Sequence, residues 1–428
     1  MRLTPPTNRR TVGVAAAVLV HLVLVGLTLF GRLDRFYDDA MHRLGRGTDF
    51  SVYVDAGTRL WHGLPLFGEG PAFGFRYHPL LAAWSALVGR VIPPAIAYWL
   101  WCGVIELGFI ALVAYVVHRA PRERVIPLAW LCALYTPLHL EIFMGQLSFV
   151  SGVLVLGRFI FLANRRLASF TVAACVAVIA KPIALVLAPA VLDRRTWRPL
   201  AVGAGALAGS AALYFALMPG EFARFVAVNF VPIDMAGWMV HAGHHGLNGF
   251  LTTLFTRESG IPVADIASLK ELPAWSRAVL AVYPAGVLAL AGLTAWRRRP
   301  PVELAALLWT CSFFLVYKDI WEHSYAFMLV PLVIYFCRAE APSRLVIVGA
   351  IVIALPTAFV FYDVPLSPGP NDPERLWSLA TSLAYHATKP AGVIVIMVGV
   401  LRETFGSRSA ARPSRRLHRL LSVVNGIT

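Results

Sequence analysis

Residues 95–117 read AIAYWLWCGVIELGFIALVAYVV, a run in which Glu106 is the one charged side chain. About 20 apolar residues in a helix cross the hydrocarbon core of a bilayer, so this run predicts a transmembrane helix. Similar runs recur along the chain. Of its 428 residues, 58% are hydrophobic and 14% are charged, against about 25% charged in soluble domains. This composition excludes an ordinary soluble protein and a disordered chain. Because the apolar residues run on without alternating, it also excludes a β-barrel.

We therefore predict an all-α polytopic membrane protein, with residues 1–428 forming one domain of about twelve transmembrane helices. The predicted spans are the runs of apolar residues at about 11–30, 95–117, 125–143, 147–163, 168–180, 183–193, 199–218, 276–296, 301–317, 324–338, 343–362 and 379–401. Runs 168–180 and 183–193 are short and predict a shallow hairpin broken at Pro182. Residues 79–92 lie between prolines and are too short to span, so we predict a non-spanning helix there.

The basic residues predict the orientation of the chain. The formal net charge is +15, and the arginines cluster in short stretches between the apolar runs. Such clusters mark the cytoplasmic side of a membrane protein, so the charge does not indicate a nucleic-acid partner. Both termini, including the basic tail 402–428, are predicted to lie in the cytoplasm. Two long segments, 31–78 and 219–275, then face outward from the cell membrane, and we expect them to carry the active site.

The first outer segment carries an acidic residue beside a helical pattern. Tyr53, Ala56, Leu60 and Trp61 have helical spacing, which predicts a short amphipathic helix on the membrane surface. Asp49 would lie at its amino end. There it can cap the helix, or it can act as a general base toward an acceptor hydroxyl.

Two further polar residues lie at the ends of apolar runs. Gln146 follows Gly145 at an outer junction, where its amide can bind sugar hydroxyls or simply occupy a polar turn. Lys181 lies between two apolar runs, just before Pro182. A lysine in this position is a functional candidate. It can bind a phosphate, or it can extend to nearby lipid head groups.

Two later segments are also rich in polar groups. Residues 241–249 contain His244, His245 and Asn248 among glycines. No carboxylate or cysteine stands close by, so a loop that hydrogen-bonds substrate is favoured over a metal site. Residues 318–325 contain Lys318, Glu322 and His323. His323 can move a proton or bind a phosphate oxygen, and the alternative is a belt of interfacial anchors.

The order of these segments resembles glycosyltransferase family 87, a family of membrane enzymes of the GT-C superfamily. The resemblance covers about residues 11–340. Its matching pieces are Thr48-Asp49-Phe50, Tyr53, Ala56-Gly57, His62-Gly63, Phe75-Arg76-Tyr77-His78-Pro79, Gly145-Gln146, Lys181-Pro182, Asn248-Gly249 and His323-Ser324. The chain departs from the family pattern at Leu80, where the family often has proline, and at Ser148, where it often has asparagine.

The resemblance implies a GT-C fold and transfer of a hexose, most often mannose, from a polyprenyl-phosphate sugar to a glycolipid or glycan acceptor, with inversion. It implies no organic cofactor. Dependence on a metal varies across GT-C enzymes, and the sequence contains no convincing set of metal ligands. The implied catalytic residues are Asp49 and His323. The implied donor-phosphate residues are Lys181, Arg59 and Lys318. The implied substrate-binding residues are Tyr53, Tyr77, His78, Gln146, His244, His245, Asn248 and Glu322.

Two alternatives remain open at this point. The same mechanism could transfer arabinose or glucose. The chain could instead be a transporter or flippase of a polyprenyl-linked saccharide, which would need ionisable residues near the middle of the bilayer. The sequence indicates few such residues beyond Glu106, and this favours an enzyme at the outer boundary.

Overall fold

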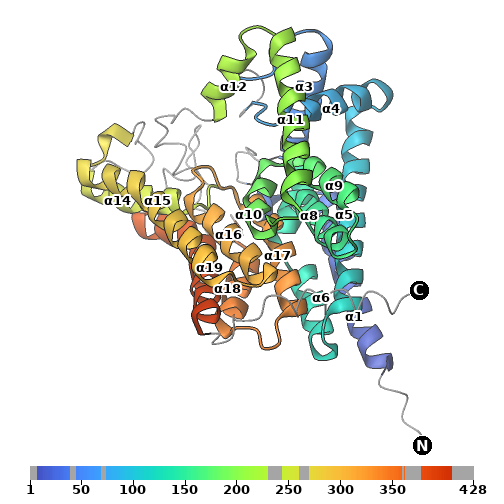
Figure 1. Cartoon of the computed structure of the whole chain (residues 1–428), viewed down its shortest axis with the longest axis vertical. Helices are drawn as coiled ribbons and strands as arrows, with labels where there is room; N and C mark the ends of the chain where they lie inside the picture. The colour runs from blue at the N-terminus through green and yellow to red at the C-terminus, as the bar shows by residue number, and fades with distance from the viewer. Residues whose placement is uncertain are drawn as a thin grey trace, which may run out of the picture. The chain divides into compact units, whose positions relative to one another are not determined.

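The computed structural model in Figure 1 describes residues 7–38, 45–68, 74–229, 243–259, 269–358, 361 and 377–406. The predicted tail beyond Gly406 and parts of both predicted outer segments lie outside these ranges. Every regular element in the described residues is a helix, apart from one isolated bridge between His244 and Trp321. The prediction of an all-α protein is therefore confirmed.

The chain divides into two compact units. Unit 1 comprises Met1–Arg46, Phe109–Phe143 and Asp234–Gly406, and unit 2 comprises Gly47–Gly108, Met144–Ile233 and Ser407–Thr428. The helices of unit 2 are α3 (Thr48–Trp61), α4 (Pro79–Val91), α8 (Ser148–Ala163), α9 (Leu167–Ala180), η2 (Pro182–Leu187), α10 (Ala188–Val191), α11 (Trp197–Leu217) and α12 (Glu221–Asn229). The helix α5 (Pro94–Arg119) contributes residues to both units.

The remaining helices belong to unit 1, α7 reaching one residue beyond it. They are α1 (Thr7–Leu29), α2 (Asp34–Tyr37), η1 (Arg122–Arg124), α6 (Val125–Ala133), α7 (Thr136–Met144), α14 (Leu247–Ser259), η4 (Leu269–Glu271), α15 (Ala274–Arg298), α16 (Val302–Val316), η5 (Glu322–Tyr325), α17 (Ala326–Arg338), α18 (Arg344–Ala354) and α19 (Leu379–Gly406).

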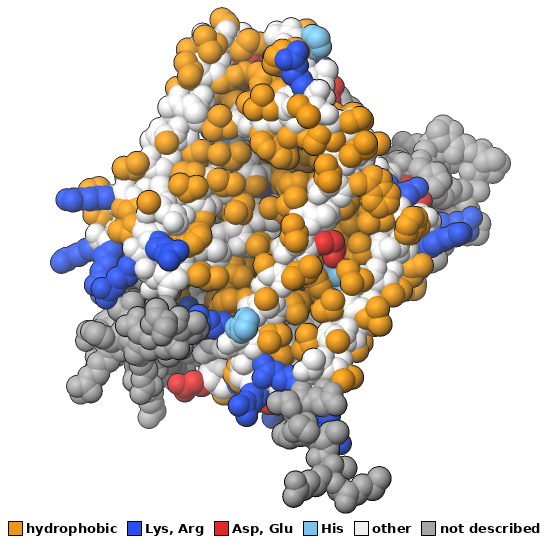
Figure 2. All heavy atoms as spheres, turned by 90° about the vertical axis from the view of Figure 1, so that its right-hand side faces the viewer, with side chains coloured by type: hydrophobic (Ala, Val, Ile, Leu, Met, Phe, Trp, Pro, Cys, Tyr) orange, Lys and Arg blue, Asp and Glu red, His pale blue; other side chains and the backbone are white. Residues whose placement is uncertain are grey.

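Six helical stretches among the described residues are long and apolar enough to cross a membrane: Arg9–Leu29, Pro94–Arg119, Arg122–Met144, Trp197–Leu217, Ala274–Arg298 and Leu379–Gly406. Their exposed apolar side chains, such as Leu100 and Leu107 of α5, are suited to contact with lipid. Figure 2 shows one face on which hydrophobic side chains predominate. The chain is therefore a polytopic membrane protein, while twelve spans stays a prediction.

Prolines explain where several helices end. The predicted run 125–143 is divided into α6 and α7, because the ring of Pro137 clashes with helical backbone one turn earlier. The run 343–362 is helical only to Ala354, and Leu355 before Pro356 is extended. A residue before proline disfavours the helical conformation. The predicted break at Pro182 is confirmed, since α9 ends at Ala180 and Lys181 is extended. Residues 79–91 form the short helix α4, as expected.

In unit 2, α3 packs against α4, and α9 packs against both α8 and α11. A buried carboxylate fixes the chain that follows α3. One oxygen of Glu221 accepts hydrogen bonds from the backbone N–H of Leu66 at 2.6 Å and of Phe67 at 3.3 Å, and from the Tyr214 hydroxyl at 3.0 Å. These bonds satisfy the buried charge and hold the segment that leads toward Tyr77.

In unit 1, α19 packs against α14, α16 and α18. Figure 1 shows α18 and α19 beside each other. Small residues allow this contact. A Cβ atom added at Gly349 would lie 2.6 Å from the carbonyl oxygen of Gly392, and one added at Gly392 would lie 2.6 Å from Cγ1 of Ile353. Close approach through glycine is a common means of packing membrane helices.

We predict that Gly349→Ala destabilises the protein by about 1–3 kcal/mol, because the added methyl group overpacks the contact between α18 and α19. Thermal unfolding of the purified protein in detergent measures this as a lower midpoint. The matched control is Gly286→Ala in α15, where an added Cβ meets nothing within 4 Å, so the midpoint should stay level or rise. Equal midpoints for the two variants would contradict the packing.

Candidate functional site

Asp49 is the second residue of α3 in unit 2. The residue that precedes the helix is Gly47, which has a left-handed conformation, and α3 has no side-chain cap. The interpretation of Asp49 as the N-cap is therefore wrong. Its Oδ2 atom instead accepts a hydrogen bond of 2.6 Å from Nε2 of Gln146. A carboxylate in the first turn is also favoured by the helix dipole.

Gln146 joins Asp49 to two other predicted site residues. Its Oε1 atom accepts hydrogen bonds from the Tyr53 hydroxyl at 2.9 Å and from Nζ of Lys181 at 3.2 Å. Lys181 also donates to Oγ of Ser148 at 2.6 Å. Because Lys181 is extended before Pro182, its side chain leaves the end of α9 and reaches the start of α8. Residues far apart in the sequence thus form one polar cluster within unit 2.

Tyr77 adds an aromatic side to this cluster. Its hydroxyl lies 3.3 Å from that of Tyr53, and the two rings meet edge to face at 5.2 Å. Two other predicted residues of unit 2 have structural partners. Arg59 donates to the carbonyl of Pro65 at 2.7 Å. His78 caps α4 by accepting from the N–H of Leu80.

The contacts of the two ring nitrogens of His78 define the tautomer of its neutral ring. Because Nδ1 accepts a hydrogen bond, the neutral ring carries its proton on Nε2, which lies 3.1 Å from the carbonyl of Leu207. Burial lowers the pKa of His78 below its ordinary value, although the bond to Leu207 opposes this. His78 is therefore a neutral residue that links α4 to α11, and its predicted contact with substrate stays a prediction.

The other predicted residues lie in unit 1, where a loop at 243–246 pairs with the segment before η5. Nε2 of His244 lies 2.8 Å from the carbonyl of Lys318, and the N–H of His245 donates to the carbonyl of Ile320 at 2.7 Å. Asn248 accepts a short hydrogen bond from the Tyr283 hydroxyl. His323 is buried, with its ring nearly parallel to that of Trp321.

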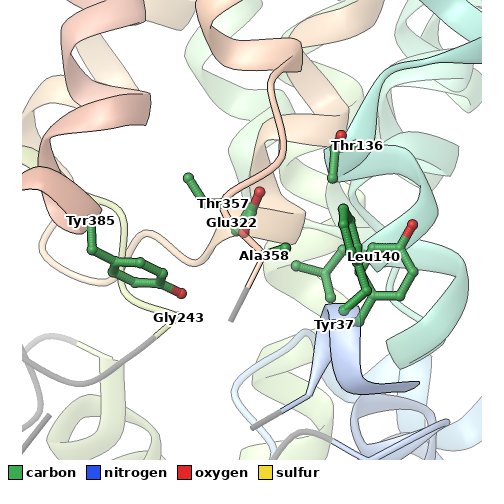
Figure 3. Close-up of a pocket in the computed structure, with 9 residues that line it drawn as sticks. Tyr37, Thr136, Leu140, Gly243, Glu322, Thr357, Ala358 and Tyr385 are labelled. Carbon is green, nitrogen blue, oxygen red and sulfur yellow. The ribbon is translucent and has the colours of Figure 1, made fainter. Parts of the chain in front are cut away.

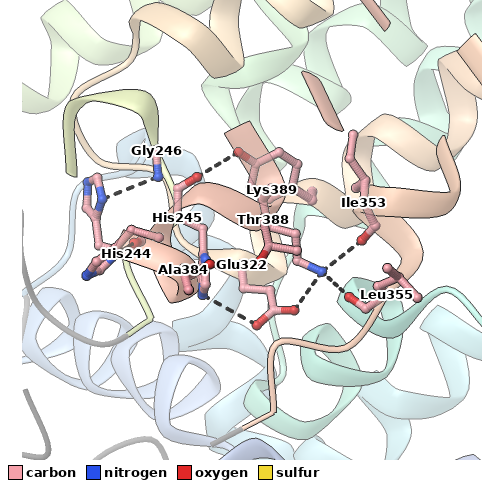
Figure 4. A network of polar contacts seen from close by, with 11 residues as sticks. His244, His245, Gly246, Glu322, Ile353, Leu355, Ala384, Thr388 and Lys389 are labelled. Atoms are coloured by element: carbon pink, nitrogen blue, oxygen red, sulfur yellow. Dashed lines mark hydrogen bonds and ion pairs between the residues drawn. The ribbon is translucent and has the colours of Figure 1, made fainter. Parts of the chain in front are cut away.

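A buried charged network lies behind this loop (Figure 4). Nζ of Lys389 is 2.9 Å from Oε1 of Glu322, and Nε2 of His245 is 3.7 Å from Oε2 of the same carboxylate. Burial lowers the pKa of His245 well below its ordinary value, and His386, Lys389 and His244 lower it further. His245 is therefore neutral, and Lys389 is the cation that balances Glu322.

Lys389 was not predicted as a functional residue. It is fully buried in α19, and Nζ also donates to the carbonyls of Ile353 at 2.8 Å and Leu355 at 2.5 Å. These carbonyls lie at the end of α18, where a positive charge is favoured. The sequence did contain a signal, since a lysine within the apolar run 379–401 is as exceptional as Lys181.

Glu322 also borders a small pocket of unit 1, drawn in Figure 3. The pocket brings together Tyr37 of α2, Thr136 of α7 and Tyr385 of α19 around the carboxylate. Its wall therefore combines aromatic rings, hydroxyl groups and one acidic group. In the part of the chain that the structure describes, no three His, Cys, Asp or Glu side chains converge as a metal site would require.

The sequence profile of glycosyltransferase family 87 matches residues 75–317, which is more than half of the chain. The chain belongs to glycosyltransferase family 87. It is therefore a membrane glycosyltransferase, which acts on a sugar donor and an acceptor. No curated protein sequence matches the chain. The matched range includes Gln146 and Lys181 of the glycosyltransferase. Asp49 and Glu322 lie outside it.

The sequence indicated few ionisable residues near the middle of the bilayer beyond Glu106, and this expectation stays a prediction. Several helices of the glycosyltransferase carry buried ionisable side chains, namely His21, His139, Glu141, Arg158 and Lys389. Membership of the family is what favours sugar transfer over transport.

We predict that Lys389→Met destabilises the glycosyltransferase by about 3–5 kcal/mol, because it leaves the buried carboxylate of Glu322 without its cation. The double variant Lys389→Met with Glu322→Gln removes both charges and should recover most of this loss. Unfolding midpoints in detergent measure both effects. The control is Lys270→Met, since Lys270 is exposed and such changes usually cost under about 0.5 kcal/mol. A Lys389→Met protein as stable as the control would contradict the ion pair.

Proposed function

We propose that the protein transfers a hexose, most simply mannose, from a polyprenyl-phosphate sugar to a glycolipid or glycan acceptor on the outer face of the cell membrane. The observation that carries this proposal is the hydrogen-bonded series Asp49, Gln146 and Lys181 in unit 2. In this series, a single side chain, that of Gln146, bridges a carboxylate suited to accept a proton and an ammonium group suited to bind a phosphate.

The proposed step balances without a further reactant. A hydroxyl group of the acceptor gives its proton to the Asp49 carboxylate, and the oxygen attacks C1 of the donor sugar. The bond between C1 and the phosphate oxygen breaks, and its electron pair leaves with polyprenyl phosphate. Attack from the side opposite the leaving group inverts C1. Lys181 stabilises the negative charge that grows on the leaving phosphate, a kind of electrostatic support that is usually a large contribution to catalysis.

The lipid surroundings support a lipid-linked donor. Lys181 lies between the apolar helices α9 and η2, where a phosphate can remain at the boundary while its prenyl chain stays in hydrocarbon. Tyr53 and Tyr77, whose rings meet edge to face, supply the aromatic and hydroxyl groups that suit a sugar ring. Arabinose and glucose satisfy the same geometry, so sugar identity rests on the resemblance. The roles of His323, Lys318, His244, His245, Asn248 and Glu322 stay predictions.

We predict that Asp49→Asn lowers the rate of transfer by about 10²–10⁴-fold, because asparagine cannot accept the proton. The fold should survive, since an asparagine oxygen can still accept the hydrogen bond from Gln146. The assay follows radiolabelled mannose from a polyprenyl phosphate into the lipid extract of the source cells.

The matched control is Asp55→Asn in the same helix. Asp55 lies six residues further on, about 240° round α3, and should tolerate the change. If Asp49→Asn transfers sugar at the wild-type rate while Asp55→Asn is inactive, the assignment of Asp49 as the general base is wrong.

A further inference from the structure

Gln146 is the only glutamine in the chain, and its backbone is held rigidly. Gly145 before it has φ of 74°, and a Cβ atom there would lie 2.6 Å from Cβ of Phe50. Glycine therefore allows the turn to approach α3. The carbonyl of Gln146 accepts a hydrogen bond of 3.1 Å from the indole N–H of Trp101. The side chain thus starts from a fixed point, and the residue is only 4% exposed.

The partners of the amide determine its orientation by chemistry alone. The Lys181 ammonium can only donate, so the amide atom that it meets at 3.2 Å must be the oxygen. The Asp49 carboxylate can only accept, so the atom at 2.6 Å from it must be the nitrogen. In a flipped amide, the N–H groups would face the Lys181 ammonium, so two donors would meet. The amide oxygen would face the Asp49 carboxylate, so two acceptors would meet. The network therefore permits one orientation.

The accepting capacity of this amide is already used. A carbonyl oxygen has two lone pairs, and Oε1 of Gln146 meets three donors: the Tyr53 hydroxyl at 2.9 Å, Nζ of Lys181 at 3.2 Å and the N–H of Leu147 at 3.3 Å. Its Nε2 atom donates to Asp49. A substrate hydroxyl could donate to Oε1 only by displacing one of these groups. The second N–H of Nε2 is the remaining amide group that could bind a sugar hydroxyl, and that predicted role of Gln146 stays a prediction.

We propose that Gln146 is a positioning residue, which holds the Asp49 carboxylate in the orientation for proton transfer and joins it to the donor side through Lys181. This inference rests on the proposed function of Asp49 and deepens it. Proton transfer depends on the placement of the base, and a misplacement of about 1 Å can cost about 10²-fold in rate. Fixing one carboxylate oxygen with a hydrogen bond of 2.6 Å limits the rotation of the Asp49 side chain.

Ser148 makes the two sides of the cluster separable. Lys181 donates to Oγ of Ser148 at 2.6 Å as well as to Gln146. When the amide of Gln146 is removed, Ser148 still holds the ammonium group. Loss of Gln146 should therefore disturb the base more than it disturbs the binding of the donor phosphate.

The test measures kcat and donor KM for Gln146→Leu, with radiolabelled polyprenyl-phosphate mannose as donor and the lipid extract of the source cells as acceptor. We expect kcat to fall by about 10²-fold, while the donor KM changes less than about threefold. An unchanged kcat would overturn the proposal, and so would a large rise in KM at unchanged kcat, because that pattern indicates uniform substrate binding.

A double-mutant cycle with Tyr53→Phe gives a second and independent measurement. In the wild type, Tyr53→Phe removes one donor that fixes the amide, and we expect a lower kcat. In the Gln146→Leu protein the same change should have little further effect, because there is no amide left to fix. Additive losses would overturn the proposal. If Gln146→Leu does not fold, the cycle is repeated between Tyr53→Phe and Gln146→Asn, which keeps a polar amide on a shorter side chain, and additive losses there overturn the proposal in the same way.

Two variants complete the design. Ser151→Ala is the matched control. Ser151 is a buried serine of α8, and its hydroxyl donates to the carbonyl of Ala177. The kcat of this variant should stay at the wild-type value.

Asp49→Asn, assayed beside it, separates the two proposals. An active Asp49→Asn enzyme overturns the proposed base. An inactive one, together with a Gln146→Leu enzyme of wild-type kcat, overturns the positioning role alone.

Discussion

A break in an apolar helix leaves backbone groups without helical partners, and the two lysines of the polar clusters described above both lie against such a break. In lipid, each backbone N–H and C=O group needs a partner within the protein. Helix breaks leave such groups unpaired, and they attract polar side chains. Pro182 makes Lys181 extended at the end of α9. Pro356 follows the end of α18, whose last carbonyls receive the ammonium group of Lys389.

The same constraint gives each unit its polar cluster. In unit 2, the turn at Gly145 and the break at Lys181 bring an amide and an ammonium group to the start of α8, and Asp49 completes the series from α3. In unit 1, Lys389 pairs with Glu322 and also donates to two carbonyls at the end of α18. The first cluster combines a proton acceptor with a cation, which is the chemistry that sugar transfer from a phosphate requires. The second is a buried ion pair, to which we assign a role in stability.

Much of this arrangement could be predicted from the sequence, because hydropathy and proline act locally. The apolar runs, the short helix at 79–91 and the break at Pro182 follow from length and from ring geometry. Gln146 and Lys181 were recognised as polar residues at the ends of apolar runs, and Asp49 was recognised at the amino end of a short amphipathic helix.

The sequence could not show how these residues pair, since a hydrogen bond between α3 and the turn before α8 depends on packing. Position alone suggested that Gln146 binds sugar hydroxyls, and that role stays a prediction. The contacts add what position could not show, an amide oxygen already occupied by protein donors. The function of Lys389 depends in the same way on a helix end far away in the sequence.

The most direct test of the account is the identity of the sugar donor. The purified protein, reconstituted in lipid vesicles with the lipid extract of the source cells, is given radiolabelled mannose, glucose or arabinose, each either on polyprenyl phosphate or on a nucleotide. We predict that label moves to the acceptor only from the polyprenyl phosphate, and that polyprenyl phosphate is released in equal amount. Transfer from the nucleotide sugar, with none from polyprenyl-phosphate mannose, glucose or arabinose, would contradict it.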